Sequence, residues 1–311
     1  MRVHEGIPRP GTAKGPSAVT IGVFDGLHLG HKALLETCRT EADKLGGEAV
    51  VLTFQDHPDR LLRGKAPPRL QTEEAQLEGL AEAGMDLVVR IPFDEKTRDL
   101  SAATFAEEIL VQGLGCKTLV LGFDSAICKG REGTLEAFQK LGKTGGFRAL
   151  RVPPVLVDGK PVSSSSIREA LRAGDLDKVA RLLGRPWGFQ GKVEPGRKLG
   201  RELGFPTANV KPPSILLPPY GVYAALVTVE EKDHPAVVNL GIRPSVPSQS
   251  PSPLCEAHLL DGPAALEDKV LRFAFLAFLR EEKRFPTLDA LRQAIAQDCA
   301  RAQNFFCRAQ P

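Results

Sequence analysis

The sequence predicts an α/β domain with a parallel sheet, followed by a small antiparallel β domain that ends in a helix. The first observation is that apolar segments alternate with helical patterns through the first half of the chain. The second is that short strands separated by Gly and Pro replace this alternation near Gly184. The third is the length of 311 residues, which suits two domains better than one. We therefore expect one domain over residues 1–184 and another over 185–311.

A sheet is predicted for the first domain because its strand-like segments are apolar throughout and are separated by helical patterns. Strands of this kind indicate a parallel sheet covered on both faces, and such sheets bind ligands beyond the carboxyl ends of their strands. The segments are 18–24, 49–54, 87–93, 118–123 and 147–152. Between the first two, one helical face carries Leu34, Leu35, Cys38, Ala42 and Leu45.

The second domain shows short alternating strands with no helices between them, a pattern typical of an antiparallel barrel or sandwich. The expected strands are 188–193, 220–229, 236–241, 255–260 and 271–279. Residues 243–254 are rich in Pro and Ser, and we expect a loop there. A final helix follows, with Thr287 as its N-cap. Its apolar stripe is Leu288, Leu291, Ile295, Cys299 and Ala302.

Composition excludes several classes of protein. The formal net charge of +3 argues against a dedicated nucleic-acid binder, and no apolar run is long enough to span a bilayer. The N-terminus lacks the apolar core of a secretory signal, and the 6 cysteines form no CxxC pair. We expect buried free thiols and a cytoplasmic protein without a membrane or nucleic-acid partner. The oligomeric state cannot be read from the sequence.

The first motif is FDGLHLGH, residues 24–31, which follows the first predicted strand. A glycine-rich turn that leads into a helix presents free backbone N–H groups and the positive end of the helix dipole, a combination that suits phosphate. Gly26 and Gly30 would let a ligand approach the backbone, and His28 and His31 could donate hydrogen bonds to phosphate oxygens. A helix start with two incidental histidines, or a metal-binding pair, is the alternative.

The second motif is VSSSSIREAL, residues 162–171. Serines at the start of a helix offer a second anion site, and Arg168 adds a planar guanidinium. An ordinary serine N-cap is the alternative interpretation. The two motifs together, in one α/β domain, are much more specific than either alone.

The third motif is GKVEPGRKLGRELGFPTANV, residues 191–210. Its glycines and basic residues could form a flap that meets phosphate. Thr207 and Asn209 lie two positions apart and therefore on one side of an extended chain, where their oxygens suit Mg²⁺ held together with phosphates. Composition alone would favour a glycine-rich surface turn.

Together these motifs resemble the bacterial bifunctional riboflavin kinase/FAD synthetase family, over residues 17–306. The resemblance implies a Rossmann-like nucleotidyltransferase domain of the HxGH type, then a riboflavin kinase barrel. In the first domain His28, His31 and Arg168 would act on the phosphates of ATP during transfer of AMP to FMN. The nucleotide would also contact Gly22, Phe24, Asp25, Gly26, Gly30, Asp124, Arg131, Ser164 and Ser165. The flavin would lie near Phe54, His57 and Pro58.

One segment departs from the family pattern GxDFxFGxxRxG. This chain has GFDSAICKGREG at 122–133, so Ser125 and Ile127 replace two aromatic residues and Cys128 replaces a glycine. Fewer stacking surfaces and a lost glycine could impair adenylyl transfer. We expect the activity to be retained, because other changes in the wall of the site would compensate for these replacements.

In the second domain the resemblance assigns residues to riboflavin phosphorylation with MgATP. Glu256, unusual in an apolar strand, would be the general base for the ribityl hydroxyl. Thr207 and Asn209 would bind Mg²⁺, and His258 receives no catalytic role. Gly196, Gly200 and Gly204 would contact the nucleotide. Arg280 and Phe285 would border the flavin, although a charged start of the last helix is the preferred explanation for most of Arg280, Glu281 and Phe285. The segment at 239–246 carries Ser245 and Val246 where Thr and Phe are usual.

The leading hypothesis is therefore an enzyme that converts riboflavin to FMN and FMN to FAD, with ATP as co-substrate of both reactions. A monofunctional riboflavin kinase with a degenerate first domain is the alternative that Cys128 and its neighbours raise. A non-catalytic flavin carrier is disfavoured by the combination of Thr207, Asn209 and Glu256. An RNA-binding barrel protein is disfavoured by the near-neutral charge and the lack of aromatic clusters.

Overall fold

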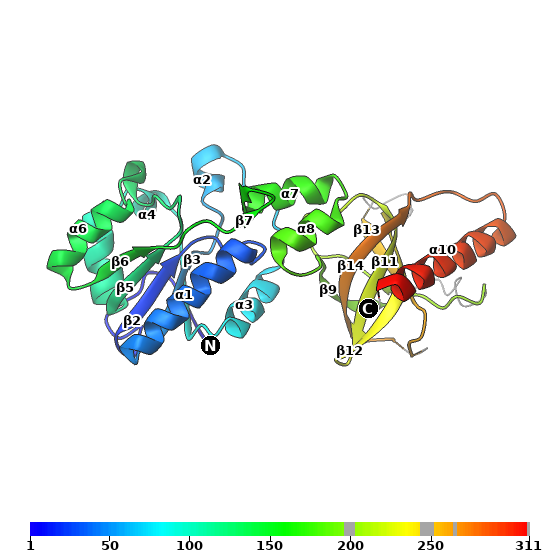
Figure 1. The fold of residues 1–311 in the computed structure, drawn as a ribbon, viewed down its shortest axis with the longest axis horizontal. Coiled ribbons are helices and arrows are strands. Elements are labelled where there is room, and N and C mark those ends of the chain that lie inside the picture. Colours follow the sequence, from blue (N-terminus) through cyan, green and yellow to red (C-terminus); the bar gives the residue numbers. More distant parts are fainter. Residues whose placement is uncertain (196–202, 243–251, 264–265, 310–311) are drawn as a thin grey trace. The chain divides into compact units, whose positions relative to one another are not determined.

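The computed structural model describes residues 1–195, 203–242, 252–263 and 266–309 (Figure 1). The chain divides into two compact units, Met1–Ser164 and Ser165–Pro311. The division assigns nearly all of α7 (Ser164–Arg172) and all of α8 (Leu176–Leu183) to the second unit, whereas the sequence places the boundary after Gly184. That functional boundary remains a prediction. In the described part of the chain, no helix has both the length and the apolar character needed to cross a membrane.

A parallel sheet forms the centre of the first unit, in the order β1-β4-β3-β2-β5-β6 (Figure 1). Its strands are β1 (Arg2–Glu5), β2 (Ser17–Ile21), β3 (Glu48–Phe54), β4 (Leu87–Ile91), β5 (Cys116–Leu121) and β6 (Arg148–Arg151). Every neighbouring pair is parallel, as predicted. The sequence did not reveal β1, because an edge strand that alternates between half-buried and exposed residues lacks the apolar run of the central strands.

The strand before the first motif is shorter than predicted. β2 ends at Ile21, and the Gly22 N–H still donates to the Leu52 carbonyl at 3.1 Å. The backbone then turns, because Phe24 adopts a positive φ of 53° that a strand cannot continue. The loop that follows β2 is therefore longer than the sequence suggested.

Helices cover both faces of this sheet. The helices of the unit are α1 (Leu29–Leu45), α2 (Asp59–Arg63), α3 (Glu73–Glu82), α4 (Glu95–Arg98), α5 (Ala102–Thr104), the π-helix η1 (Phe105–Gly113), the 3₁₀ turn η2 (Lys129–Arg131) and α6 (Leu135–Gly145). On one face, Leu35, Cys38 and Ala42 of α1 pack on the sheet with Leu80 of α3. A short hairpin of β7 (Leu156–Val157) and β8 (Lys160–Pro161) precedes α7.

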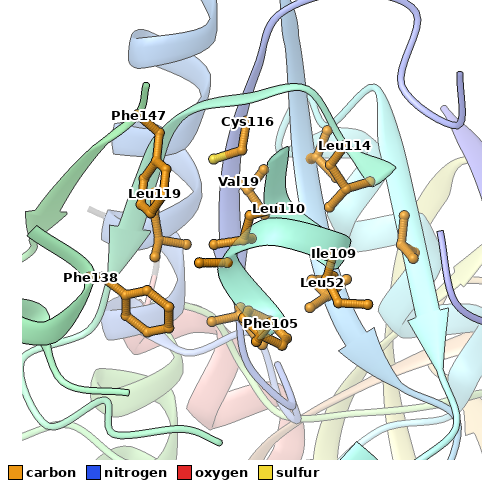
Figure 2. Close-up of a cluster of buried hydrophobic side chains, with 14 of the residues drawn as sticks. Val19, Leu52, Phe105, Ile109, Leu110, Leu114, Cys116, Leu119, Phe138 and Phe147 are labelled. Carbon is orange, nitrogen blue, oxygen red and sulfur yellow. The ribbon is translucent and has the colours of Figure 1, made fainter. Parts of the chain in front are cut away.

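The opposite face of the sheet packs against η1 and α6. Figure 2 shows Phe105, Ile109 and Leu110 of η1 over Val19 and Leu52 of the central strands. Phe138 of α6 and Phe147 complete the cluster, and the Phe105 and Phe138 rings meet edge to face at 6.2 Å. Two packed faces make the central strands fully buried and leave their carboxyl ends as the place where polar chemistry can be exposed.

The second unit contains a closed barrel in the order β10-β13-β12-β11-β14-β9. Its strands are β9 (Gln190–Glu194), β10 (Ala208–Val210), β11 (Gly221–Val229), β12 (Lys232–Ile242), β13 (Pro253–Leu259) and β14 (Val270–Arg280), and all neighbours are antiparallel. The barrel alternative is confirmed. The sequence did not identify β10 as a strand of its own. Residues 243–251 of the predicted loop, with Ser245 and Val246, lie outside the described residues, and Pro253 already belongs to β13.

The helix α10 (Leu288–Ala309) packs on the outer face of the barrel. Thr287 caps it as predicted, since its Oγ1 accepts a hydrogen bond from the Ala290 N–H at 3.2 Å. Cys299 and Ala302 are buried against Val222 and its neighbours, but Leu288 is 57% exposed. The predicted stripe is therefore wrong at its first residue, because the helix reaches the barrel only after its first turns.

All six cysteines are free thiols, as expected. Cys38, Cys116, Cys255 and Cys299 are buried, and Cys128 is half-buried. Cys307 is exposed, which corrects the expectation that all of these thiols are buried.

Candidate functional site

The first motif forms a folded loop between β2 and α1. Phe24, Gly26 and Leu27 adopt positive φ angles, which turn the chain sharply beyond the carboxyl end of β2. The Asp25 carboxylate is buried and accepts hydrogen bonds from the Leu70 N–H at 2.9 and 3.1 Å. Asp25, predicted to contact nucleotide, therefore braces the loop through its side chain.

His28 and His31 are brought together at the start of α1. His28 is the N-cap, and its Nδ1 accepts a hydrogen bond from the His31 N–H at 3.3 Å. The two rings are stacked, with centroids 3.6 Å apart, and the Phe24 ring lies 5.1 Å from that of His31. Burial and the charge of His28 hold the pKa of His31 well below its ordinary value of 6.5. In the unliganded protein His31 is thus neutral at pH 7 and can offer a hydrogen bond, but no charge.

Gly30 and Ser164 complete this corner of the first unit. A Cβ at Gly30 would lie 3.2 Å from the His28 ring, so glycine allows the imidazole to fold over the first turn of α1. The Ser164 hydroxyl donates to the Asp25 carbonyl at 2.9 Å, across 139 residues of sequence. The two motifs that the sequence paired are therefore in contact through this bond.

Ser165 and Arg168 follow in the part of α7 that belongs to the second unit. Arg168 is buried, with 6% of its surface exposed. That these two residues close on the phosphates of a nucleotide remains a prediction.

A cavity lies beside the loop and is lined by two of the three residues of the first domain that were predicted to lie near the flavin. Phe54 at the end of β3 and His57 line it together with Asp25. Pro58 does not line the cavity and is instead the N-cap residue of α2. Sequence reasoning missed other lining residues, because glutamine and arginine in a connecting segment carry no periodic signal. These are Val23, Asp56, Arg69, Gln71, Thr72 and Gln76.

The segment that departs from the family pattern forms a compact turn of its own. Ile127 and Gly133 pair as an isolated bridge, and Arg131 Nη2 donates to the Asp124 carbonyl at 3.5 Å. Asp124 and Arg131 are both exposed. Cys128 adopts φ 67° and ψ −179°, a conformation that is essentially restricted to glycine. The backbone therefore keeps a glycine-like path although the glycine is absent.

In the barrel, strand register places the predicted kinase residues side by side. Asn209 of β10 pairs directly with Glu256 of β13, so both side chains lie on the same face. Thr207 is exposed and lies two residues before Asn209, which is 8% exposed. Val210 and Cys255 pair on the opposite face, where both are fully buried. The polar pair is thus on the outer face of the barrel.

The register also brings Asn239 to this site, and a hydrogen bond adds Glu282; the sequence analysis gave neither residue a role. Asn239 of β12 pairs with Glu256 from the other side. Its Nδ2 donates to Glu282 Oε1 at 3.5 Å. A Cβ at Gly241 would lie 2.3 Å from the same oxygen, so glycine makes room for this carboxylate. Asn239 begins the segment at 239–246 that resembles the family, but that resemblance gave it no role, and its place beside Glu256 follows only from the strand pairing.

His258 stabilises the chain segment next to this site. Its Nδ1 lies 2.8 Å from the Pro206 carbonyl, which requires a proton on Nδ1, and its ring meets that of Phe205 at 5.5 Å. His258 therefore holds the segment that carries Thr207. Gly204 adopts a positive φ of 87° beside it, whereas Gly196 and Gly200 lie outside the described residues.

Arg280 and Phe285, predicted to border the flavin, are in contact with each other. The Arg280 guanidinium lies 5.6 Å from the centre of the Phe285 ring. It also forms hydrogen bonds of 2.7 to 3.1 Å with the buried carboxylate of Asp298 in α10. Arg280 thus has a structural partner, and its contact with flavin remains a prediction.

These features define a class of protein. A polar loop beyond the carboxyl end of a parallel strand, followed by a helix N-terminus, is suited to bind nucleotide phosphates. A barrel with a carboxylate between two amides, near a threonine, is suited to phosphoryl transfer with a divalent ion. The chain has the two modules of an enzyme that uses a nucleotide twice.

Comparison with known proteins identifies the family. Residues 11–166 match the FAD synthetase family, and residues 183–306 match the riboflavin kinase family. The chain is 39% identical to the bifunctional riboflavin kinase/FMN adenylyltransferase of Pseudomonas fluorescens, with 91% of both chains covered. It is 37% identical to the enzyme of the same name from Escherichia coli strain K12, with 100% of both chains covered.

The chain therefore belongs to the bifunctional riboflavin kinase/FMN adenylyltransferase family. It phosphorylates riboflavin to FMN and adenylylates FMN to FAD, with ATP as the nucleotide substrate. The match to the FAD synthetase family covers residues 122–133, so the hypothesis of a degenerate first domain is not supported.

A solved structure supports the fold assignment. "Crystal Structure of Macrolide-efflux Protein from Streptococcus pneumoniae" superposes with a TM-score of 0.87, and the match covers 98% of this chain and 99% of that one. The sequence identity is 23%, so this likeness concerns the fold alone.

Proposed function

We propose that Glu256 is the general base of the kinase reaction and that Thr207 and Asn209 bind the accompanying Mg²⁺. The observation that carries this proposal is the direct cross-strand pairing of Asn209 with Glu256 on the outer face of the barrel. This pairing sets a proton acceptor beside an oxygen ligand, as transfer of phosphate from a metal-bound nucleotide to a hydroxyl requires.

The donor set fits Mg²⁺. A hydroxyl and an amide oxygen are hard ligands, and an ion held by two such groups keeps positions for phosphate oxygens and water. When bound, Mg²⁺ would neutralise charge on the ATP phosphates. Glu256 would orient the 5′-hydroxyl of riboflavin and accept its proton as the oxygen attacks the γ-phosphate of ATP, with ADP as the leaving group. His258 would keep Thr207 in place through the Pro206 carbonyl.

In the first unit, we propose that the loop and the N-terminus of α1 bind the phosphates of ATP. The positive end of the α1 helix dipole and a neutral, hydrogen-bonding His31 favour the negative charge that builds up on the phosphates. The FMN phosphate oxygen attacks the α-phosphorus, and pyrophosphate leaves. His28 and Ser164 would orient the phosphate chain, while Phe54 and His57 would lie beside the flavin.

Replacement of Glu256 by glutamine tests the assignment of the base. Glu256→Gln keeps the shape of the side chain and removes its basicity, so we expect kcat for FMN formation to fall about 10²- to 10⁴-fold. The same preparation, given FMN and MgATP, should form FAD at the rate of the unmodified enzyme, which controls for folding. FMN formation at an unchanged rate would show that another group removes the proton.

A further inference from the structure

The cavity beside the first loop has a polar end that phosphate chemistry does not explain. Its empty space of about 340 Å³ includes open solvent, so it is a hollow that opens to the surface rather than an enclosed chamber. Gln71 lines this cavity and is 7% exposed, and Arg69 lines it two residues earlier. Neither residue has a part in the proposed phosphate contacts.

The orientation of the Gln71 amide follows from its surroundings. Its Nε2 donates to the Phe24 carbonyl at 3.3 Å. Gln76 also donates to that carbonyl, at 3.2 Å, and to the Val23 carbonyl at 2.7 Å. Because backbone carbonyls only accept hydrogen bonds, the nitrogen of Gln71 must face the loop and its oxygen must face away.

The outward oxygen is an acceptor without a donor. Oε1 of Gln71 is buried and accepts no hydrogen bond from the part of the chain that the structure describes. A buried acceptor in this state is unfavourable unless a bound molecule brings an N–H or O–H group to it. Arg69 is half-buried, lines the same cavity two residues before Gln71, and forms no ion pair within the described residues. The lining of the cavity therefore includes one residue with an unsatisfied acceptor and, two positions away, one with a group of strong donors.

We propose that Gln71 determines specificity by accepting a hydrogen bond from the N3–H of the flavin ring. The pyrimidine edge of an isoalloxazine presents carbonyl, N–H and carbonyl in a row, so an acceptor flanked by donors complements it. Arg69 would donate to one of the flanking carbonyls. This inference rests on the proposed position of FMN in the cavity with Phe54 and His57. It adds the group that distinguishes the imide edge of a flavin from ring systems without an N–H there.

A flavin methylated at N3 tests the proposal. We expect the KM of FAD formation to be about tenfold to a hundredfold higher for 3-methyl-FMN than for FMN in the unmodified enzyme, because the methyl group removes the donor. In Gln71→Leu the KM for FMN should rise to a similar extent, and methylation should then have little further effect. Gln71→Glu, which keeps an acceptor, should retain discrimination against the methylated flavin.

Gln76→Met is the matched control, since it removes a hydrogen bond to the same Phe24 carbonyl but no acceptor proposed for the flavin. N3 methylation of FMN should raise the KM of this variant by the same factor as in the unmodified enzyme. Equal KM values for FMN and 3-methyl-FMN in the unmodified enzyme would overturn the proposal without any variant. The proposal would also be overturned if N3 methylation raised the KM of Gln71→Leu by as large a factor as that of the unmodified enzyme. Failure of the proposed phosphate site has a separate signature, namely FAD formation at an unchanged rate in His28→Ala.

Discussion

At the scale of single residues, Cys128 explains how a departure from the family pattern is accommodated. Its φ of 67° and ψ of −179° lie in a region that side chains strongly disfavour. The conformation is held by the Lys129 N–H, which donates to the Leu100 carbonyl at 2.9 Å, and by the bridge between Ile127 and Gly133. The Cys128 side chain also packs on the core beneath η1, and burial raises the pKa of its thiol to about 12. The thiol is therefore a small apolar group at neutral pH.

The strain at Cys128 leads to a prediction about stability. Cys128→Ala removes the sulfur but keeps a Cβ in the disfavoured conformation, whereas Cys128→Gly removes both. We expect the glycine variant to be more stable than the alanine variant by about 1–2 kcal/mol, the reverse of their usual order. Calorimetric unfolding of the two variants would measure this difference. An alanine variant as stable as the glycine variant would indicate that the backbone relaxes at this position.

His31 gives the first unit a dependence of stability on pH. The pKa of its imidazole is lowered in the folded chain, first by burial and then by His28. Above about pH 6.5 the group is neutral in the folded and the unfolded chain, and it contributes no pH dependence. Below this pH the unfolded chain binds a proton that the folded chain does not, so the free energy of unfolding falls by up to about 1.4 kcal/mol per pH unit.

Urea titrations between about pH 7.5 and pH 5.5 would measure this dependence. His31→Gln has no titrating group at the position and should lose stability less steeply as the pH falls. Equal slopes for the two proteins would mean that His31 is protonated to the same extent in the folded and the unfolded chain.

At the scale of elements, one ion pair fixes α10 to the barrel. Asp298 of α10 is 2% exposed, and the Arg280 guanidinium of β14 contacts both of its oxygens. Cys299 and Ala302 add apolar contacts next to it. A buried carboxylate left without its partner is strongly unfavourable, so the pair determines how the helix docks even though its net contribution is small.

Removal of one partner should therefore be costly, and removal of both should not. We expect Arg280→Met to lower the free energy of unfolding of the second unit by about 3–5 kcal/mol. The double variant Arg280→Met/Asp298→Leu should recover most of this loss. Trp187, the single tryptophan of the chain, is buried against Phe275 and reports unfolding of this unit by its fluorescence. A double variant as unstable as the single one would show that the geometry of the pair, rather than its charge balance, holds the helix.

At the scale of the whole molecule, the sequence predicts both architectures because their patterns are periodic. Apolar strands separated by helices indicate the parallel sheet, and short alternating strands indicate the barrel. The sequence did not predict the edge strand β1 or the short strand β10, because neither carries an apolar run of its own. Pairing across strands is what places Asn239 beside Glu256, and no local pattern encodes it.

The candidate sites were predictable to the extent that they follow motifs. His28 and His31 lie three positions apart in sequence and are stacked in space, and Ser164 joins their loop as the paired motifs suggest. Gln71 comes from a connecting segment, and its importance depends on an unpaired oxygen that only the folded chain reveals. Arg280 illustrates the reverse case, because its partner Asp298 lies 18 residues away on a different element.

Two sites that share FMN as product and substrate raise the question of how the intermediate passes between them. The proposed base Glu256 and the proposed phosphate-binding His28 belong to different compact units, and we expect FMN to be released from the first site before it binds to the second. We expect Glu256→Gln alone to form almost no FAD from riboflavin, and His28→Ala alone to stop at FMN. An equimolar mixture should form FAD after a lag, and the lag should shorten as the protein concentration rises, because FMN then diffuses between molecules. Chromatographic time courses of FMN and FAD would follow both steps. A mixture in which FMN stays bound to His28→Ala and no FAD forms, although Glu256→Gln converts added FMN, would mean that the kinase site does not release its product.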